Sequence, residues 1–132
     1  MIKKIDHVAV VVRSIEASLP FYERMLGIKC AMVKEVPTDG VRIAFLPLGE
    51  SEIELVEPVD PNSGVARFLE SRGEGLHHIC LDVDDIDQEI KALAEKGAAL
   101  IDKAPREGAA AMVAFMHPKA ASGVLIELSQ RQ

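Results

Sequence analysis

The stretch Gly75-Leu-His-His-Ile-Cys-Leu-Asp-Val-Asp-Asp85 decides the fold, because the chain uses the same pattern twice. Near the start, Lys4–Ser14 reads Lys-Ile-Asp-His-Val-Ala-Val-Val-Val-Arg-Ser. When the two stretches are aligned at an offset of 71 residues, His7 falls on His78, and Val8, Val10 and Val12 fall on Ile79, Leu81 and Val83. The sequence therefore predicts that the chain is a duplicated module.

The repeat continues beyond these two stretches. Ile15–Gly27 and Ile86–Gly97 are each typical of a helix of about three turns that is ended by glycine. Later in each half, Glu52-Ile-Glu-Leu-Val56 resembles Gly123-Val-Leu-Ile-Glu-Leu128. Each half therefore supplies one histidine on its first strand and one glutamate on its last strand, namely His7, Glu54, His78 and Glu127.

The alternation of side chains along a strand predicts which groups share a face. His7 shares its face with Ala9, whereas Val10 points to the other face, and His78 is opposite Leu81 in the same way. Aliphatic residues also flank the two glutamates on the opposite face: Ile53, Leu55, Ile126 and Leu128. We expect helices to cover the aliphatic face and the candidate ligands to line a cavity on the other.

Composition limits the class of protein. A chain of 132 residues with 48% apolar residues is long enough for one domain, or for two small modules sharing a sheet. No run approaches the roughly 20 apolar residues of a membrane span, and Met1–Asp6 leads into the first strand without a signal peptide. We expect a cytoplasmic protein whose Cys30 and Cys80 are reduced. A formal charge of −6 argues against nucleic acid as a partner.

The predicted elements follow a βαβββ plan in each half. In the first half they are a strand at 4–12, a helix at 16–26, and strands near 30–36, 41–47 and 51–57. A segment rich in turn residues at 58–64 marks the module boundary and precedes a short helix at 65–72. The second half has a strand at 76–83, a helix at 85–96, and strands near 98–103, 111–117 and 123–129. Pro20 lies near the start of the first helix, where its missing N–H costs little.

Several short strings occur in order and cover essentially the whole chain. They are Ile5–His7, Met25–Gly27, Glu52–Pro58, Gly75–Ile79, Val83–Ile86, and Phe115–Lys119 before Gly123–Leu128. Through these strings the chain resembles the methylmalonyl-CoA epimerases, a family of the vicinal oxygen chelate (glyoxalase/bleomycin resistance/dioxygenase) superfamily. The resemblance implies an α+β fold in which two βαβββ modules, 1–60 and 73–132, form a cup-shaped mixed sheet within a single domain, 1–132.

The resemblance also implies a divalent metal that is bound by a histidine and a glutamate or glutamine from each half. The corresponding positions are His7, Glu54, His78 and Glu127. Two imidazoles and two carboxylates suit a borderline ion, for which Co²⁺ is favoured and Mn²⁺, Ni²⁺ or Zn²⁺ are alternatives. His77 has no counterpart in the repeat, so we expect it to be structural.

The implied reaction is the interconversion of (R)- and (S)-methylmalonyl-CoA by removal of the α-proton. A metal that holds the thioester oxygen would stabilise the enolate, and Glu127 would act as both ligand and base. Some members of the family carry a second carboxylate at the position of Ile43, so the second proton donor here is water, another side chain, or absent because the reaction differs. Weaker candidates for binding an anionic part of the substrate are Arg106, His117 and Lys119.

Two alternatives stay open at this point. One is a glyoxalase I-like lyase or isomerase that acts on a thiol hemithioacetal. The other is a non-catalytic module of the same fold that binds small molecules, although a chain with 4% aromatic residues and no tryptophan is poorly equipped for stacking. The resemblance further implies a homodimer that takes acyl-CoA as its substrate and has neither nucleic acid nor a membrane as partner.

Overall fold

The structure is a computed structural model that describes residues 1–131. The chain forms two compact units. One unit, called here the terminal unit, consists of Met1–His7 and His78–Gln132, and the other, the central unit, consists of Val8–His77. Two strands, β1 (Ile2–Val11) and β5 (Gly75–Val83), run through both units. Each unit is therefore described by itself.

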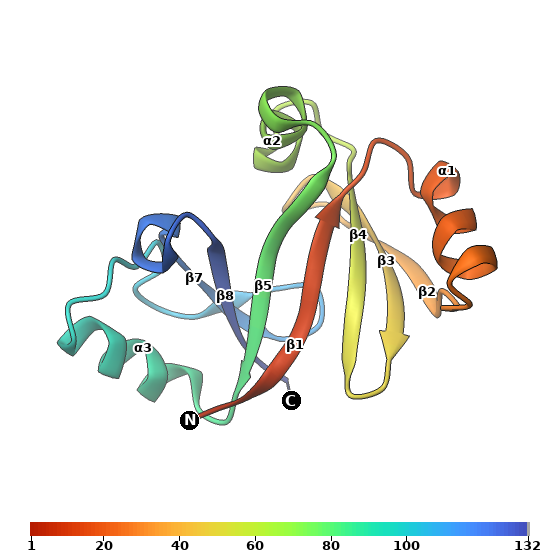
Figure 1. The fold of residues 1–132 in the computed structure, drawn as a ribbon. Helices are drawn as coiled ribbons and strands as arrows, with labels where there is room; N and C mark the ends of the chain where they lie inside the picture. Colours follow the sequence, from red (N-terminus) through yellow and green to blue (C-terminus); the bar gives the residue numbers. More distant parts are fainter. Residues whose placement is uncertain (132) are drawn as a thin grey trace. The chain divides into compact units, whose positions relative to one another are not determined.

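The central unit combines strands with helices. Its strands are hydrogen-bonded in the order β2-β3-β4-β1, where β2 is Met32–Val36, β3 is Val41–Leu48 and β4 is Ser51–Pro58. Strand β3 pairs in antiparallel fashion with both β2 and β4. Helix α1 (Ile15–Pro20) lies beside these strands in Figure 1, and α2 (Gly64–Arg72) follows the turn-rich segment after β4.

The core of the central unit lies on the face predicted for it. Its buried cluster consists of Val12, Ile15, Ala44, Leu46 and Leu55, which come from the end of β1, α1, β3 and β4. Val10 and Ile53 pack against this cluster and are partly buried. The expectation that a helix covers this face is therefore confirmed.

The first helix differs from the continuous helix predicted at 16–26. It is α-helical only to Pro20 and continues as a π-helix over Phe21–Met25. The N–H of Leu26 donates to the carbonyl of Phe21, five residues earlier, over 3.1 Å. Because proline has no N–H and its ring crowds the preceding turn, the regular four-residue ladder cannot run through this position.

The terminal unit contains a mixed set of strands. Their order is β1-β5-β8-β7-β6, where β8 is Leu125–Gln130, β7 is Met112–Met116 and β6 is Arg106–Glu107. Strand β5 pairs with β8 in parallel, whereas β8 with β7 and β7 with β6 are antiparallel. Helix α3 (Ile86–Glu95) and a 3₁₀-helix (Pro118–Ala121) complete the unit (Figure 1). Asp85 caps α3 by accepting from the N–H of Gln88 over 3.1 Å.

The predicted strand at 98–103 is wrong. Only Leu100 forms a bridge there, with Met116. The N–H groups of Ile101 and Asp102 both donate to the carbonyl of Phe115, so the chain bulges instead of continuing a ladder. Pro105 cannot donate to a neighbouring strand, and regular pairing is limited to the two residues of β6.

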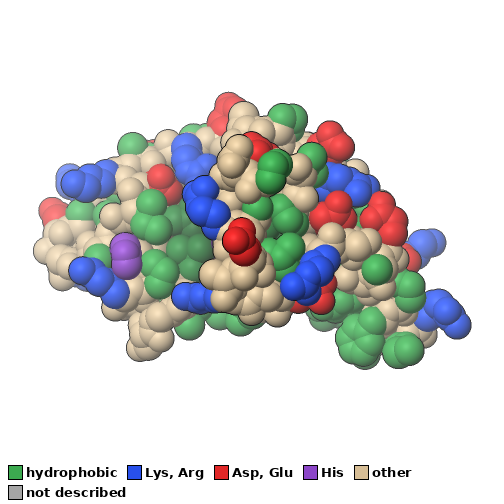
Figure 2. Space-filling view, turned by 90° about the horizontal axis from the view of Figure 1, so that it is seen from above, with side chains coloured by type: hydrophobic (Ala, Val, Ile, Leu, Met, Phe, Trp, Pro, Cys, Tyr) green, Lys and Arg blue, Asp and Glu red, His purple; other side chains and the backbone are tan. Residues whose placement is uncertain are grey.

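The core of the terminal unit again lies on the predicted face. Val83, Ile86, Ile90, Ala114 and Leu128 form the buried cluster, and Leu81 packs against it with partial exposure. The two halves therefore both show a strand, a helix and further strands, which confirms the α+β fold of two βαβββ modules. Among the described residues, no helix is long and apolar enough to cross a membrane. Lysine and arginine side chains are interspersed with aspartate and glutamate on the face drawn in Figure 2.

Candidate metal centre

Three of the four predicted ligands meet at one point in the terminal unit. His7 Nε2 lies 3.3 Å from His78 Nε2 and 3.3 Å from Glu127 Oε1, and His78 Nε2 lies 2.9 Å from the same carboxylate oxygen. All three side chains are buried. The two histidines come from the repeated strands β1 and β5, and Glu127 comes from β8. The duplicated pattern therefore does bring its histidines together.

The strand register explains how Glu127 reaches the histidines. Cys80 on β5 is the partner of Glu127 on β8 in the parallel pair, and His78 lies two residues before Cys80 on the same face. The opposite face of the same two strands carries Leu81 and Leu128, which pack in the α3 cluster. Because the aliphatic face of β5 and β8 packs in the α3 cluster, His78 and Glu127 project from the opposite face of these strands.

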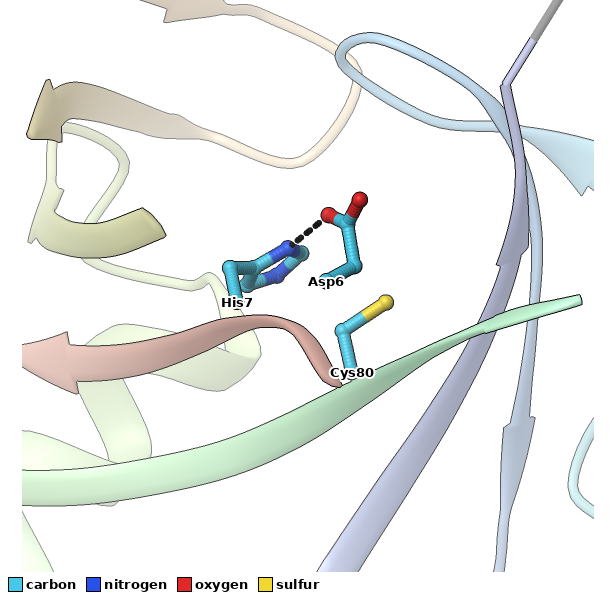
Figure 3. A group of neighbouring side chains, drawn as sticks. All are labelled: Asp6, His7 and Cys80. Carbon is cyan, nitrogen blue, oxygen red and sulfur yellow. Dashed lines mark hydrogen bonds and ion pairs between the residues drawn. The ribbon is translucent and has the colours of Figure 1, made fainter. Parts of the chain in front are cut away.

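Asp6 supports the first histidine of the site. The Nδ1–H of His7 donates to Asp6 Oδ2 over 2.7 Å, as drawn in Figure 3. Burial opposes ionisation of Asp6, but hydrogen bonds from His7 and from the guanidinium of Arg131 outweigh it and hold the pKa of Asp6 well below its usual range. Asp6 is therefore an ionised acceptor, and His7 carries its proton on Nδ1. The Nε2 of His7, which lies 3.3 Å from His78 Nε2, then faces the cluster.

Sequence reasoning did not assign Asp6 to the site. A usable signal was present, because Asp6 directly precedes a predicted ligand histidine. Histidines that bind metals usually donate their second ring N–H to a carboxylate or a carbonyl. Alternation along β1 places neighbouring side chains on opposite faces, so the strand pattern gives no sign of a contact between Asp6 and His7.

The three converging atoms fit a divalent cation. Burial raises the pKa of Glu127, but the neighbouring imidazoles of His7 and His78 lower it more strongly, to about 2, so the side chain is a carboxylate. Its buried Oε1 lies 3.3 Å from His7 Nε2 and 2.9 Å from His78 Nε2. Ligand atoms about 2.1 Å from one metal ion lie roughly 3 Å apart in octahedral geometry, close to the distances found here. A cation would satisfy all three lone pairs.

Glu54, the fourth predicted ligand, belongs to the central unit. It is buried on β4, on the face opposite Ile53 and Leu55, as the alternation predicted. Phe45 on β3 is its pairing partner, and Ile43 pairs with Val56 on the same face. Glu54 as a metal ligand stays a prediction, but its strand presents it on the expected side.

Cys80 lies against the same group of side chains. Its thiol is close to Asp6 and His7 (Figure 3), and one ligand atom from each of the three lies within 4.8 Å of the others. Burial is the main cause that raises the pKa of Cys80 to about 11. The thiol is therefore protonated at neutral pH.

Phe115 and Arg106 adjoin the site on the side of β7. The ring of Phe115 packs edge-on against the His78 ring, with 5.5 Å between centroids. The guanidinium carbon of Arg106 lies 5.3 Å from the centre of the Phe115 ring, and its Nε lies 3.5 Å from Asp102 Oδ1. Sequence reasoning proposed Arg106 but missed Phe115, whose only signal was its place in a string shared with the family.

The other histidines and the candidate Lys119 have different surroundings. His117 begins the 3₁₀-helix, where its Nδ1 accepts from the N–H of Lys119 over 3.2 Å, and Lys119 is exposed. His77 packs edge-on against Phe68 of α2, with 4.8 Å between ring centroids. This contact is consistent with the structural role predicted for His77.

Comparison with known proteins places the chain in a family. The sequence profile of the Glyoxalase/Bleomycin resistance protein/Dioxygenase superfamily matches residues 6–115. The chain is 38% identical to the ethylmalonyl-CoA/methylmalonyl-CoA epimerase of Cereibacter sphaeroides, over 98% of this chain and 99% of that protein. It is 35% identical to the mitochondrial methylmalonyl-CoA epimerase of Homo sapiens, over 96% of this chain and 73% of that protein.

A solved structure agrees with these sequence matches. The methylmalonyl-CoA epimerase from Mycobacterium tuberculosis superposes with a TM-score of 0.94 at 31% identity, over 99% of this chain and 89% of that one. The resemblance of the short strings and the predicted enzyme class, an epimerase, are thereby confirmed. The chain belongs to the Glyoxalase/Bleomycin resistance protein/Dioxygenase superfamily.

Proposed function

We propose that the protein catalyses the metal-dependent interconversion of (R)- and (S)-methylmalonyl-CoA. The observation that carries the proposal is the buried meeting of His7, His78 and Glu127, where an ionised carboxylate stands beside two imidazoles. Support also comes from the relatives, one of which is a methylmalonyl-CoA epimerase solved in complex with methylmalonyl-CoA, at 30% identity and a TM-score of 0.94.

The residues that would hold the metal are His7, His78 and Glu127, with Glu54 as the fourth ligand by the symmetry of the repeat. Their donor set favours Co²⁺, with Mn²⁺, Ni²⁺ or Zn²⁺ as alternatives. When bound, such an ion supplies electrophilic stabilisation of the negative charge that develops on the thioester oxygen.

Glu127 is the proposed base. Its carboxylate is ionised at neutral pH and buried, so it can accept the α-proton of a thioester in a site with little competing water. A pKa of about 2 makes it a weak base, so the transfer depends on strong stabilisation of the enolate. Inversion also needs a donor on the opposite face of the carbon. Ile43 cannot serve, so water or another side chain must return that proton.

Arg106 is the strongest of the three candidates for substrate binding. Its guanidinium is held over Phe115, which in turn contacts His78, so its positive charge stands beside the proposed centre. His117 and Lys119, next to the 3₁₀-helix, stay weaker candidates for an anionic part of the acyl-CoA. A cytoplasmic location and a homodimer stay predictions of the sequence.

Deuterium exchange tests the proposal. The Co²⁺-loaded protein should exchange the α-proton of methylmalonyl-CoA with solvent and interconvert the two epimers, as followed by NMR and chiral chromatography. Glu127→Gln should lower both rates by at least about 100-fold, and Glu107→Gln on the exposed strand β6 serves as the control. Turnover of a hemithioacetal without any α-proton exchange would favour the glyoxalase-like alternative.

A further inference from the structure

We propose that Arg131 and Asp6 form a clamp that holds the His7 imidazole in the tautomer and orientation needed for metal binding. In this role Arg131 is a positioning residue that acts through Asp6. The inference rests on the proposed metal site, which it extends from the ligands to the groups that orient them.

Both carboxylate oxygens of Asp6 are engaged. Oδ1 accepts from Arg131 Nε over 2.8 Å, and Oδ2 accepts from Arg131 Nη2 over 3.0 Å and from His7 Nδ1 over 2.7 Å. Two parallel bonds from a planar guanidinium fix the plane of a carboxylate, which a single bond from a lysine cannot do. Asp6 is therefore unable to rotate away from His7 without breaking the pair with Arg131.

The imidazole of His7 is held between two carboxylates with different tasks. Its Nδ1 faces Asp6, and its Nε2 points at Glu127 Oε1 over 3.3 Å. Fixing the proton on Nδ1 leaves the Nε2 lone pair directed at the cluster, which is the arrangement that binding of a metal requires. A change in the Asp6 carboxylate would thus alter the protonation and direction of His7 Nε2.

Strand β8 carries one proposed ligand and is followed directly by the arginine of the clamp. Arg131 directly follows β8, which also carries Glu127, and it reaches Asp6 across 125 residues of sequence. The pairing of β8 with β5 therefore sets the position of the ligand Glu127 and of the arginine that fixes His7. A shift of β8 would therefore move both Glu127 and Arg131.

A plain stabilising ion pair is the competing explanation. Asp6 is buried, whereas the Arg131 side chain is 45% exposed. Removing the arginine leaves a buried carboxylate without its guanidinium partner, which is costly in any folded protein. Stability alone therefore does not separate the two explanations, and the test must observe His7 and the metal affinity.

The state of His7 can be measured in the metal-free protein. We expect ¹⁵N-resolved NMR of the imidazoles to show His7 with its proton on Nδ1 in the wild type. The signal of this proton should be lost in Asp6→Ala. In Arg131→Gln the Nδ1 proton should exchange faster with solvent. Because no metal is needed, this experiment decides the clamp separately from the proposed metal site.

Zn²⁺ affinity, measured by competition with a chromophoric chelator, tests the consequence. Asp6→Asn and Arg131→Gln should each weaken binding by about 10–100-fold, and Arg131→Lys should recover part of the loss. Adding Arg131→Gln to Asp6→Asn should change the affinity by less than about twofold, because the arginine acts through the aspartate. Arg42→Gln is the matched control, since Arg42 pairs with Glu16 and Glu57 in the central unit.

Two results would overturn the clamp. In one, Arg131→Gln lowers the melting temperature but leaves both the His7 signal and the Zn²⁺ affinity unchanged. In the other, the losses from Asp6→Asn and Arg131→Gln multiply in the double variant, which would show that they act independently. A wild-type protein with the His7 signal but without Zn²⁺ binding would instead overturn the proposed metal site and leave the hydrogen-bonded clamp standing.

Discussion

His77 and His78 are adjacent on β5, yet they face different surroundings. His78 meets His7 and Glu127 in the terminal unit, whereas His77 packs on Phe68 in the central unit. His78→Ala should lose most of the bound metal, and His77→Ala should keep most of it, because His78, unlike His77, presents a ring nitrogen to the cluster. Metal content after dialysis, measured by plasma mass spectrometry, checks this. Equal losses would show that the proposed ligand set is wrong.

Ile43 is a second informative position at the scale of single residues. Its pairing with Val56 places it on the face of β3 and β4 that carries Glu54. With no carboxylate at this position, we expect α-proton exchange that retains configuration to be faster than inversion. Ile43→Glu should raise the inversion rate by about tenfold or more, while Ile43→Gln should not. A ratio of exchange to inversion that is the same in all three proteins would contradict this role.

The packing of α3 on the terminal unit gives a prediction at the scale of elements. Leu128 is 1% exposed in this cluster, whereas Leu81 lies at its edge and is partly exposed. Leu128→Ala should lower the free energy of unfolding by about 3–5 kcal/mol and Leu81→Ala by about 2 kcal/mol, since a site at the edge leaves a smaller cavity. Urea denaturation followed by circular dichroism measures both. A larger cost for Leu81 than for Leu128 would contradict the placement of Leu81 at the edge of this cluster.

At the scale of the whole molecule, metal binding should be coupled to folding. The three proposed ligands lie on β1, β5 and β8, so the proposed site exists only when the terminal unit is assembled. A ligand present at about 100 times its dissociation constant stabilises the folded state by roughly 2.7 kcal/mol. Co²⁺ or Zn²⁺ should therefore raise the melting temperature of the wild type in calorimetry. The same addition should leave that of His78→Ala nearly unchanged, and a rise of equal size in both would place the metal elsewhere.

Much of this protein was predictable from local sequence. The alternation of side chains along a strand is a property of the backbone itself, so the repeat was enough to place Val10, Leu81 and the ligand histidines on their correct faces. The helix beginning after Asp85 followed from its capping side chain. The repeat also linked His7, His78 and Glu127 before any contact between them was known.

The remaining features depend on contacts between residues that are distant in sequence. The segment beside β7 is irregular because the N–H groups of Ile101 and Asp102 share the carbonyl of Phe115. The carboxylate of Asp102 also accepts from the N–H of Phe115. The clamp of Arg131 on Asp6 exists only because β8 pairs beside β5, which brings together residues 125 positions apart. No local pattern encodes such a meeting. The sequence by itself determined most of the elements, their faces and the candidate ligands, whereas the tertiary structure decided how His7 is oriented, because only folding brings a carboxylate and a guanidinium to the far side of its ring.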